Sequence, residues 1–166
     1  AILKGSARAI SDGSFKDAMG TSSTVIYGDG ESHRIISVNA VPGHRQEQSA
    51  YRSELAGIEG ALAILESVCT VHGIQQGAAT IGLDGEQALI AASSDWPLNP
   101  NRADFDMLTD IRAKVKSLPI TIHWKWIKGH QDDNVRFEDL DEWAKANVLV
   151  DKLAKAYGNH VMADVS

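Results

Sequence analysis

The order of strand-like and helix-like segments restricts the fold of this chain more than any other feature. Three β-branched runs come first, joined by short turns, and a helix-like segment precedes each later strand-like run. Strands joined by tight turns pair antiparallel, whereas strands joined through a helix pair parallel. The sequence therefore predicts an α/β fold: a five-stranded mixed sheet, with three antiparallel strands and then two parallel ones, flanked by helices.

Turn residues and hydrophobic periodicity set the boundaries of these elements. The antiparallel strands are expected at Ala7–Phe15, Thr21–Tyr27 and Arg34–Val41, and Gly28-Asp29-Gly30 between the last two is a hairpin signal. The later strands are expected at Ala79–Leu83 and Ile120–Ile127, with Trp126 on the apolar side of the second. Helices are expected at Ser49–Thr70, Glu86–Ala92, Phe105–Leu118 and about Leu140–Tyr157.

Length and composition bound the class of protein. The 166 residues suit one domain, 1–166, with a core of about residues 7–157 that we expect to be part of a longer polypeptide, since no initiator Met is present. The longest apolar run, Ala61–Leu65, is far shorter than the ~20 residues of a membrane span, so no membrane partner is predicted. Cys69, the single cysteine, excludes an internal disulfide and, with no targeting signal, favours an intracellular location.

Charge argues against simple nucleic-acid binding. Lys and Arg total 16 and Asp and Glu total 22, which gives a net charge of −6. Phosphate backbones need a basic footprint. A function on nucleic acid therefore requires a local basic patch, bound metal ions or a partner domain.

Four acidic residues stand where a structural pattern favours an apolar or neutral side chain. Asp12 lies within the first strand and Asp84 ends the fourth. Glu54 opens the apolar stripe of the long helix, and Asp151 lies within the last helix. Each has a structural explanation by itself, as a turn residue, an N-cap or a first-turn acid. If the first and fourth strands are neighbours, however, the four carboxylates meet at one place.

Such a cluster needs a counter-charge. Two like charges ~4 Å apart repel by about 4 kcal/mol near a protein surface, and a whole domain is stable by only ~5–15 kcal/mol. An all-oxygen ligand set selects Mg²⁺ or Mn²⁺. Two such ions roughly 4 Å apart can activate a water and stabilise a leaving oxygen. The hypothesis requires that none of the four carboxylates is held by a lysine or arginine instead.

Five motifs, in order along the chain, resemble those of ribonuclease H. They are Ser11-Asp12-Gly13-Ser14, Ser49-Ala50-Tyr51-Arg52-Ser53-Glu54-Leu55, Leu83-Asp84, Lys128-Gly129-His130, and Asn147 with Asp151. The second is especially similar to the ribonuclease H domain of retroviral and retroelement reverse transcriptases. The resemblance implies a ribonuclease H-like fold and Mg²⁺-dependent cleavage of the RNA strand of RNA/DNA hybrids, with 5′-phosphate products. It also implies a reverse transcriptase domain in the parent polypeptide, and we expect the isolated domain to be a monomer.

The same resemblance implies roles for individual residues. Asp12 would bridge two metal ions, Glu54 and Asp84 would complete the site on the leaving-group side, and Asp151 would bind the ion that carries the attacking water. His130 would assist proton transfer or product release, since histidine changes charge near neutral pH. Substrate contacts are expected from Gly13, Ser14, Ser49, Arg52, Lys128 and Asn147, with Lys16, Arg45 and Lys125 as further cations along the substrate path.

The chain departs from the family's pattern in three places. The interval before Asp151 contains an acidic insert, Gln131–Lys145, which we interpret as a solvated loop and first-turn acids, with an acidic flap near the metals as the alternative. Gly85 stands where Ser is frequent in the family. The span Ser93–Arg102 has one base, Arg102, where some members carry a basic protrusion.

Two other functions fit parts of the pattern. A non-catalytic binding or architectural module of the same fold would explain the negative charge and the missing protrusion, but not a complete set of four carboxylates. An integrase or transposase core would place its glutamate late in the chain, unlike Glu54. Cleavage of a hybrid with and without EDTA separates the nuclease from the module.

Overall fold

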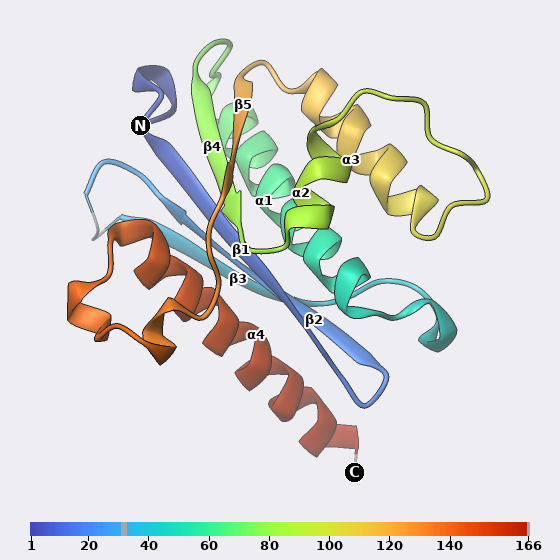
Figure 1. Cartoon of the computed structure of the whole chain (residues 1–166). Helices are drawn as coiled ribbons and strands as arrows, with labels where there is room; N and C mark the ends of the chain where they lie inside the picture. The colour runs from blue at the N-terminus through green and yellow to red at the C-terminus, as the bar shows by residue number, and fades with distance from the viewer. Residues whose placement is uncertain (31–32, 166) are drawn as a thin grey trace.

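The structure, a computed structural model, describes residues 1–30 and 33–165, with side chains up to residue 163. Its strands form one five-stranded sheet in the order β3-β2-β1-β4-β5. β1 (Ala7–Lys16), β2 (Met19–Tyr27) and β3 (Arg34–Ala40) pair antiparallel, while β4 (Ala78–Leu83) pairs parallel with β1 and with β5 (Thr121–Trp126). The mixed sheet, and the neighbouring first and fourth strands, are as predicted (Figure 1).

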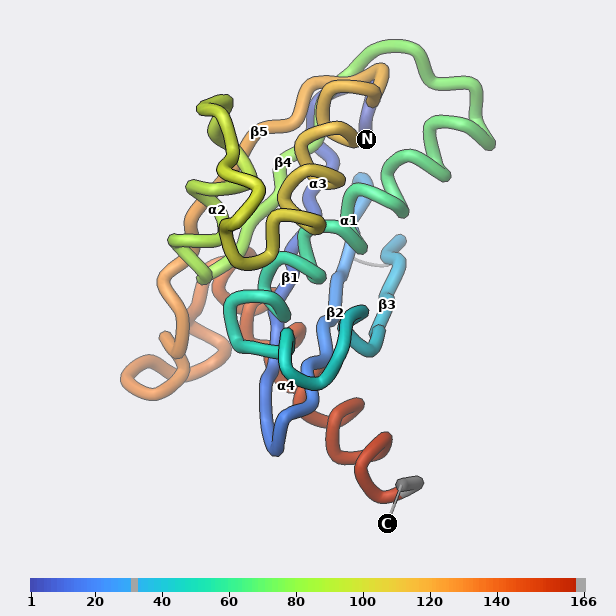
Figure 2. The backbone as a smooth tube through the Cα atoms, turned by 90° about the vertical axis from the view of Figure 1, so that its right-hand side faces the viewer, coloured from blue at the N-terminus to red at the C-terminus, as the bar shows by residue number. Residues whose placement is uncertain are grey.

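Helices lie on both faces of the sheet. α1 (Ala50–His72) packs on β1 and β2 from one side, and α4 (Glu142–Val165) packs on the same strands from the other (Figure 2). α2 (Glu86–Ser93) and α3 (Phe105–Ser117) contact α1. The middle of β1 is therefore covered on both faces, and its polar side chains there, Ser11 and Asp12, are buried.

The helix α1 is held by signals that are visible in its sequence. The Ser49 hydroxyl accepts a hydrogen bond from the Arg52 backbone N–H at 2.9 Å and caps the first turn, and Gly73 ends the helix in the left-handed region at φ 62°. Leu55, Ile58, Leu62 and Leu65 recur at steps of three and four and are fully buried in the main core. In the described part of the chain, α1 is the one helix long and apolar enough to cross a membrane, but its apolar stripe already packs on the sheet.

Buried hydroxyl groups of β2 tie both helices to the sheet. Thr21 donates to the Ala154 carbonyl of α4 at 2.8 Å, and Ser23 donates to Val150 of the same helix. On the other face, Thr24 donates to the Gly57 carbonyl of α1 at 3.1 Å. A buried hydroxyl that loses its partner costs about 1–3 kcal/mol, so these bonds fix where each helix sits on the sheet.

The predicted element bounds lie within two residues of the observed bounds except at the end of α4, and the predicted burial of one side chain in β5 is wrong. α4 continues to Val165, beyond the predicted end at Tyr157. Trp126 is 51 % exposed, because β5 is an edge strand whose apolar side is only partly covered. The third strand ends at Ala40, one residue earlier than predicted.

The acidic insert has the structure that we favoured for it. It forms two short 3₁₀ turns, Gln131–Asp133 and Phe137–Asp139, whose acidic side chains are exposed. The Asp141 carboxylate accepts from the Ala144 backbone N–H at 2.7 Å and so caps the start of α4.

Candidate active site

The carboxylates of Asp12 and Asp84 meet where the β1–β4 ladder ends. The two strands pair only from Ala7–Ala79 to Ile10–Gly82, after which β1 continues alone against β2 as far as Lys16. Asp12 lies two residues beyond the last pair on β1, and Asp84 directly follows β4. The strand ends therefore leave a gap in the sheet, and both carboxylates lie at it.

Glu54 reaches the same gap from the first turns of α1. A Cβ at position 13 would lie 2.3 Å from the carbonyl carbon of Ser53 and 2.5 Å from the Glu54 nitrogen. Only glycine allows β1 and α1 to approach so closely. Gly13, predicted as a substrate contact, thus has a structural role beside Glu54, and its N–H also donates to Asp12 Oδ1 at 2.9 Å.

The three carboxylates form a compact cluster. One oxygen from each of Asp12, Glu54 and Asp84 lies within 4.8 Å of the others, and Asp12 is only 3 % exposed. Glu54 Oε2 is buried without a hydrogen-bond partner among the described residues. The donor set is entirely oxygen, as Mg²⁺ and Mn²⁺ prefer, and the unpartnered oxygen is free to ligate. The residues present therefore fit a divalent cation.

Burial and mutual repulsion raise the pKa values of the three carboxyl groups in this cluster. Burial, and then the charges of Glu54 and Asp84, raise the pKa of Asp12 to about 10. Burial and the charge of Asp84 raise the pKa of Glu54 to about 8. Burial also raises the pKa of Asp84, although the nearby Asn147 amide and the charge of His130 oppose the shift. Without a cation, the cluster therefore holds protons at neutral pH.

Asp151 lies beside the cluster but differs from the prediction in one respect. Its carboxylate is close enough to hydrogen-bond Asp12, and its charge raises the pKa values of Glu54 and Asp84. However, its Oδ2 accepts a hydrogen bond from Lys155 Nζ at 3.0 Å, one turn further along α4. Lys155 is 57 % exposed, and an exposed i,i+4 pair contributes only about 0.3–0.5 kcal/mol. The hypothesis required that no lysine or arginine hold any of the four carboxylates, and the Asp151–Lys155 ion pair counts against it. The pair is weak, however, so a divalent cation that binds Asp151 could displace Lys155.

The loop after β5 brings His130 near the acids. Its charge acts on Asp84, and its side chain is exposed, as a proton-transfer residue requires. A Cβ at Gly129 would lie 2.7 Å from Asp84 Oδ2, so glycine lets the loop pass this carboxylate. Trp126, which the sequence did not indicate as a site residue, donates from Nε1 to the Asp84 carbonyl at 3.1 Å.

Arg52 was expected to contact substrate, and the structure gives it a different role. Its side chain is 3 % exposed and donates to the Pro42 carbonyl at 2.8 Å and to Asp104 at 3.0 Å. Its guanidinium also forms a two-bond contact with Asp106, at 3.1 and 3.0 Å. With its polar atoms bonded inside the protein, Arg52 joins α1 to the start of α3, so the prediction of a phosphate contact is wrong.

Two other predicted substrate contacts, Ser49 and Asn147, lie where they serve the protein's own structure. The Ser49 hydroxyl caps α1, as described above. Asn147 is 3 % exposed and its amide lies close enough to the Asp84 carboxylate to lower the pKa of that group, although Nδ2 makes no hydrogen bond of ordinary geometry with the described residues. Its position suits orientation of the Asp84 carboxylate rather than contact with a ligand at the surface.

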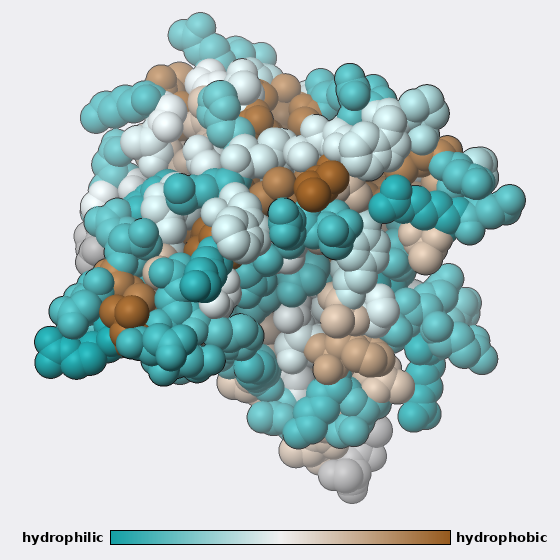
Figure 3. All heavy atoms as spheres, in the orientation of Figure 1, coloured by the Kyte–Doolittle hydropathy of each residue, from teal (hydrophilic) through white to brown (hydrophobic). Residues whose placement is uncertain are grey.

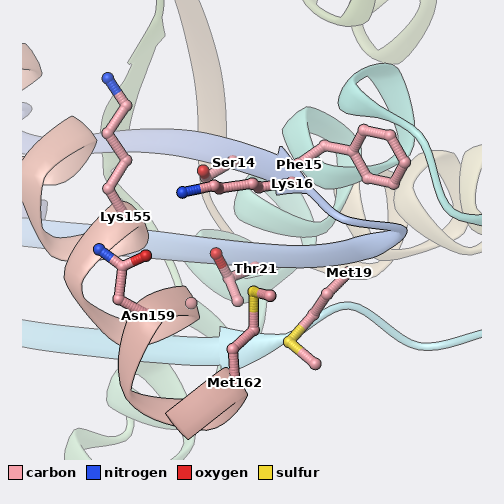
Figure 4. Close-up of a pocket in the computed structure, with 9 residues that line it drawn as sticks. Ser14, Phe15, Lys16, Met19, Thr21, Lys155, Asn159 and Met162 are labelled. Carbon is pink, nitrogen blue, oxygen red and sulfur yellow. The ribbon is translucent and has the colours of Figure 1, made fainter.

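A groove of about 310 Å³ opens next to the cluster, between the β1–β2 hairpin and α4. Ser14 and Lys16 of β1 line it on one side, with Lys155 and Asn159 of α4 on the other (Figure 4). Lys128, Lys125 and Arg45 are exposed elsewhere. The surface in Figure 3 is largely hydrophilic, with small, separate apolar areas. Because Ser14 and Lys16 line an open groove, their hydroxyl and ammonium groups are available to a polar, anionic ligand.

The raised pKa values predict how stability depends on pH when no metal is bound. Asp12 and Glu54 bind protons more tightly in the folded than in the unfolded state, since their unfolded values lie near 3.8 and 4.5. Their stabilising effect is complete at acidic pH and is lost as pH rises toward the folded values. Because the two groups are neighbours that titrate together, we count one retained proton for the pair, which corresponds to about 1.4 kcal/mol per pH unit. Urea unfolding in EDTA should therefore give a free energy about 3 kcal/mol lower at pH 7.5 than at pH 5.5.

Excess Mg²⁺ should remove much of this loss, because a ligand at 100 times its Kd stabilises the folded state by about 2.7 kcal/mol. A free energy of unfolding that rises with pH in EDTA, or that does not respond to Mg²⁺, would contradict the assignment of the cluster.

Comparison with known proteins gives similarity in structure only. No family model matches the chain, and no curated protein matches it in sequence. Among solved structures, LC11-RNase H1, isolated from compost by a metagenomic approach, is 12 % identical with a TM-score of 0.62, over 90 % of this chain and 92 % of that chain. LC11-RNase H1 in complex with an RNA/DNA hybrid gives a TM-score of 0.60 at 12 % identity, over 89 % of this chain and 98 % of that chain. With its β3-β2-β1-β4-β5 sheet between α1 and α4, the chain has the ribonuclease H fold.

Proposed function

We propose that this protein is a divalent-cation-dependent endonuclease that hydrolyses the RNA strand of RNA/DNA hybrids and leaves 5′-phosphate ends. One observation carries the proposal: Asp12, Glu54 and Asp84 come from three different elements and meet within 4.8 Å. A domain without a cation to bind would gain stability by losing these charges. The complex of LC11-RNase H1 with an RNA/DNA hybrid supports this class of substrate for the fold.

The residues of the site would have three roles: metal binding, positioning of Asp84 and proton transfer. Asp12, Glu54, Asp84 and Asp151 would hold two Mg²⁺ ions, which Mn²⁺ can replace, and the ions would supply an activated water and stabilise the leaving oxygen. The Trp126 indole would hold the Asp84 backbone through its hydrogen bond to the carbonyl, and the Asn147 amide would orient the Asp84 carboxylate. His130, which is exposed in the loop after β5, would carry a proton to or from the solvent at the edge of the cluster.

Substrate recognition would depend on shape and on the RNA 2′-hydroxyl rather than on base sequence. Ser14 and Lys16 are the candidates for the sugar and phosphate groups next to the cluster, since they line the adjacent groove. With a net charge of −6, we expect weak binding by the isolated domain. A reverse transcriptase domain in the parent polypeptide, an intracellular location and a monomeric state complete the proposal, and they rest on the sequence alone.

The test is cleavage of a hybrid whose RNA strand carries a 3′ label, in Mg²⁺, in Mn²⁺ and in EDTA. We expect cleavage with either ion, none in EDTA, and none of single-stranded RNA or duplex DNA. Each labelled product should become a substrate for a 5′-phosphate-dependent exonuclease. A folded protein that binds the hybrid without cutting it in either ion would instead be the non-catalytic module.

A further inference from the structure

A second groove, of about 710 Å³, lies at the opposite end of β1 from the β1–β2 hairpin. It is bounded by the three antiparallel strands and the start of α4, and it shares no lining residue with the groove in Figure 4. Arg8, Tyr27 and Arg34 form its floor, and Phe137, Glu142 and Lys145 stand on the α4 side. The carboxylate cluster takes no part in it.

The register of the sheet produces the floor of this groove. Arg8 pairs with Tyr27, and Tyr27 pairs with Arg34, so the three residues form one row across β1, β2 and β3. Directly paired residues point to the same face of a sheet, and neighbouring strands lie about 4.8 Å apart. The row therefore places one tyrosine between two arginines, about 10 Å from end to end.

Aromatic rings and cations alternate in this groove. The Arg8 guanidinium lies 5.4 Å from the centre of the Tyr27 ring, and Lys145 Nζ lies 5.8 Å from that of Phe137. Phe137 is 46 % exposed although it is apolar. An exposed ring in a concave, basic site offers a surface on which a planar group can stack.

The charge of the groove opposes that of the whole protein. Of the described residues, three cations and one carboxylate line it, in a chain whose net charge is −6. Glu142 pairs with Arg8, whereas Arg34 and Lys145 have no carboxylate partner among the residues that the structure describes. Two unpaired cations indicate an anionic ligand, and the rings indicate a ligand with planar groups.

We propose that this groove binds single-stranded nucleic acid. Arg34 and Lys145 would contact successive parts of the phosphate backbone, and an unpaired base would stack on Phe137. A double helix fits less well, because its bases are already stacked on one another. The proposal goes beyond the nuclease function and does not depend on the carboxylate cluster.

Fluorescence anisotropy of a labelled 12-mer of deoxythymidine, measured in EDTA, tests the proposal. Wild-type protein should bind the single strand more tightly than a duplex of equal length. Arg34→Glu/Lys145→Glu should weaken binding at least about tenfold and flatten the slope of log K against log salt by about 1.4, as expected for two lost phosphate contacts. Phe137→Ala should weaken binding at least about fivefold without changing that slope.

Arg102→Glu/Lys116→Glu is the matched control, since it changes the net charge equally at exposed positions in and before α3. We expect it to bind like wild type, and each variant should keep its unfolding midpoint and its cleavage of blunt hybrids. Equal weakening by both double variants would overturn the proposal, as would equal affinity for the duplex. If an acidic peptide displaced the labelled strand and Phe137→Ala did not change the affinity for that strand, the proposal would also be overturned. The ligand of the groove would then be an anionic protein. Failure of the wild-type protein to cleave blunt hybrids would contradict the nuclease proposal but would not affect the proposal that this groove binds a single strand.

Discussion

Asp12→Asn should reduce cleavage of RNA/DNA hybrids by about 10³-fold or more, because it removes the carboxylate at the centre of the cluster. The same change should make the metal-free protein more stable at pH 8, by about 4 kcal/mol or more, since the Asp12 carboxyl must take up a proton when the protein folds at this pH, whereas an amide need not. It should also weaken the fall in stability with pH. A variant that gains stability in EDTA and loses cleavage activity would indicate that the carboxylate serves to bind a cation rather than to stabilise the fold.

Initial cleavage rates in Mg²⁺ and urea unfolding in EDTA measure the two effects. Asp133→Asn is the matched control, because it makes the same chemical change at an exposed acid in the turn after His130. We expect that variant to retain wild-type activity and stability. Retained cleavage by Asp12→Asn would reject the nuclease assignment, and loss of stability in EDTA would reject the account of the electrostatics.

Arg52→Ala should destabilise the protein by about 3–5 kcal/mol, the largest effect that we expect on stability. The substitution leaves Asp104, whose side chain is 8 % exposed, as a buried charge without its partner. It also removes the two bonds that hold Asp106, whose pKa the guanidinium keeps below its usual range. Arg52→Lys should recover only part of the loss, because an ammonium cannot reproduce the planar two-bond contact.

Unfolding of these variants in guanidinium chloride measures their free energy of unfolding. Their affinity for the hybrid, at a temperature where they stay folded, shows whether Arg52 also contacts substrate. Arg45→Ala, at an exposed arginine in the turn before α1, serves as the control and should change stability by less than about 0.5 kcal/mol. If Arg52→Ala were as stable as wild type and bound the hybrid more weakly, Arg52 would be a substrate contact after all.

The sequence allowed prediction of the sheet and of the acids for a physical reason. Strand order follows from turn and crossover lengths, and the neighbouring positions of β1 and β4 then bring Asp12 and Asp84 together. Glu54 follows from the periodicity of α1, whose apolar stripe faces the sheet. Each of these inferences uses patterns that extend over many residues.

Interactions between single side chains were harder to predict. Nothing in the sequence distinguishes Arg52, which pairs with Asp104 and Asp106 more than 50 residues later, from an exposed arginine. A signal was available for Lys155, since the spacing of four from Asp151 favours an ion pair on a helix. The full length of α4 could also have been inferred, because Tyr157 and Val161 continue the apolar pattern of Leu153 at steps of four.

The central claim is that Asp12, Glu54 and Asp84 together bind hard divalent cations, and locating the ions tests it most directly. Crystals of wild type and of Asp12→Asn, soaked in Mn²⁺, can be compared by anomalous scattering. We predict strong peaks within coordination distance of Asp12, one of them shared with Glu54 and Asp84, Lys155 released from Asp151, and no such peaks in the variant. Wild-type crystals with saturating Mn²⁺ at pH 8 and no density between these carboxylates would contradict the account.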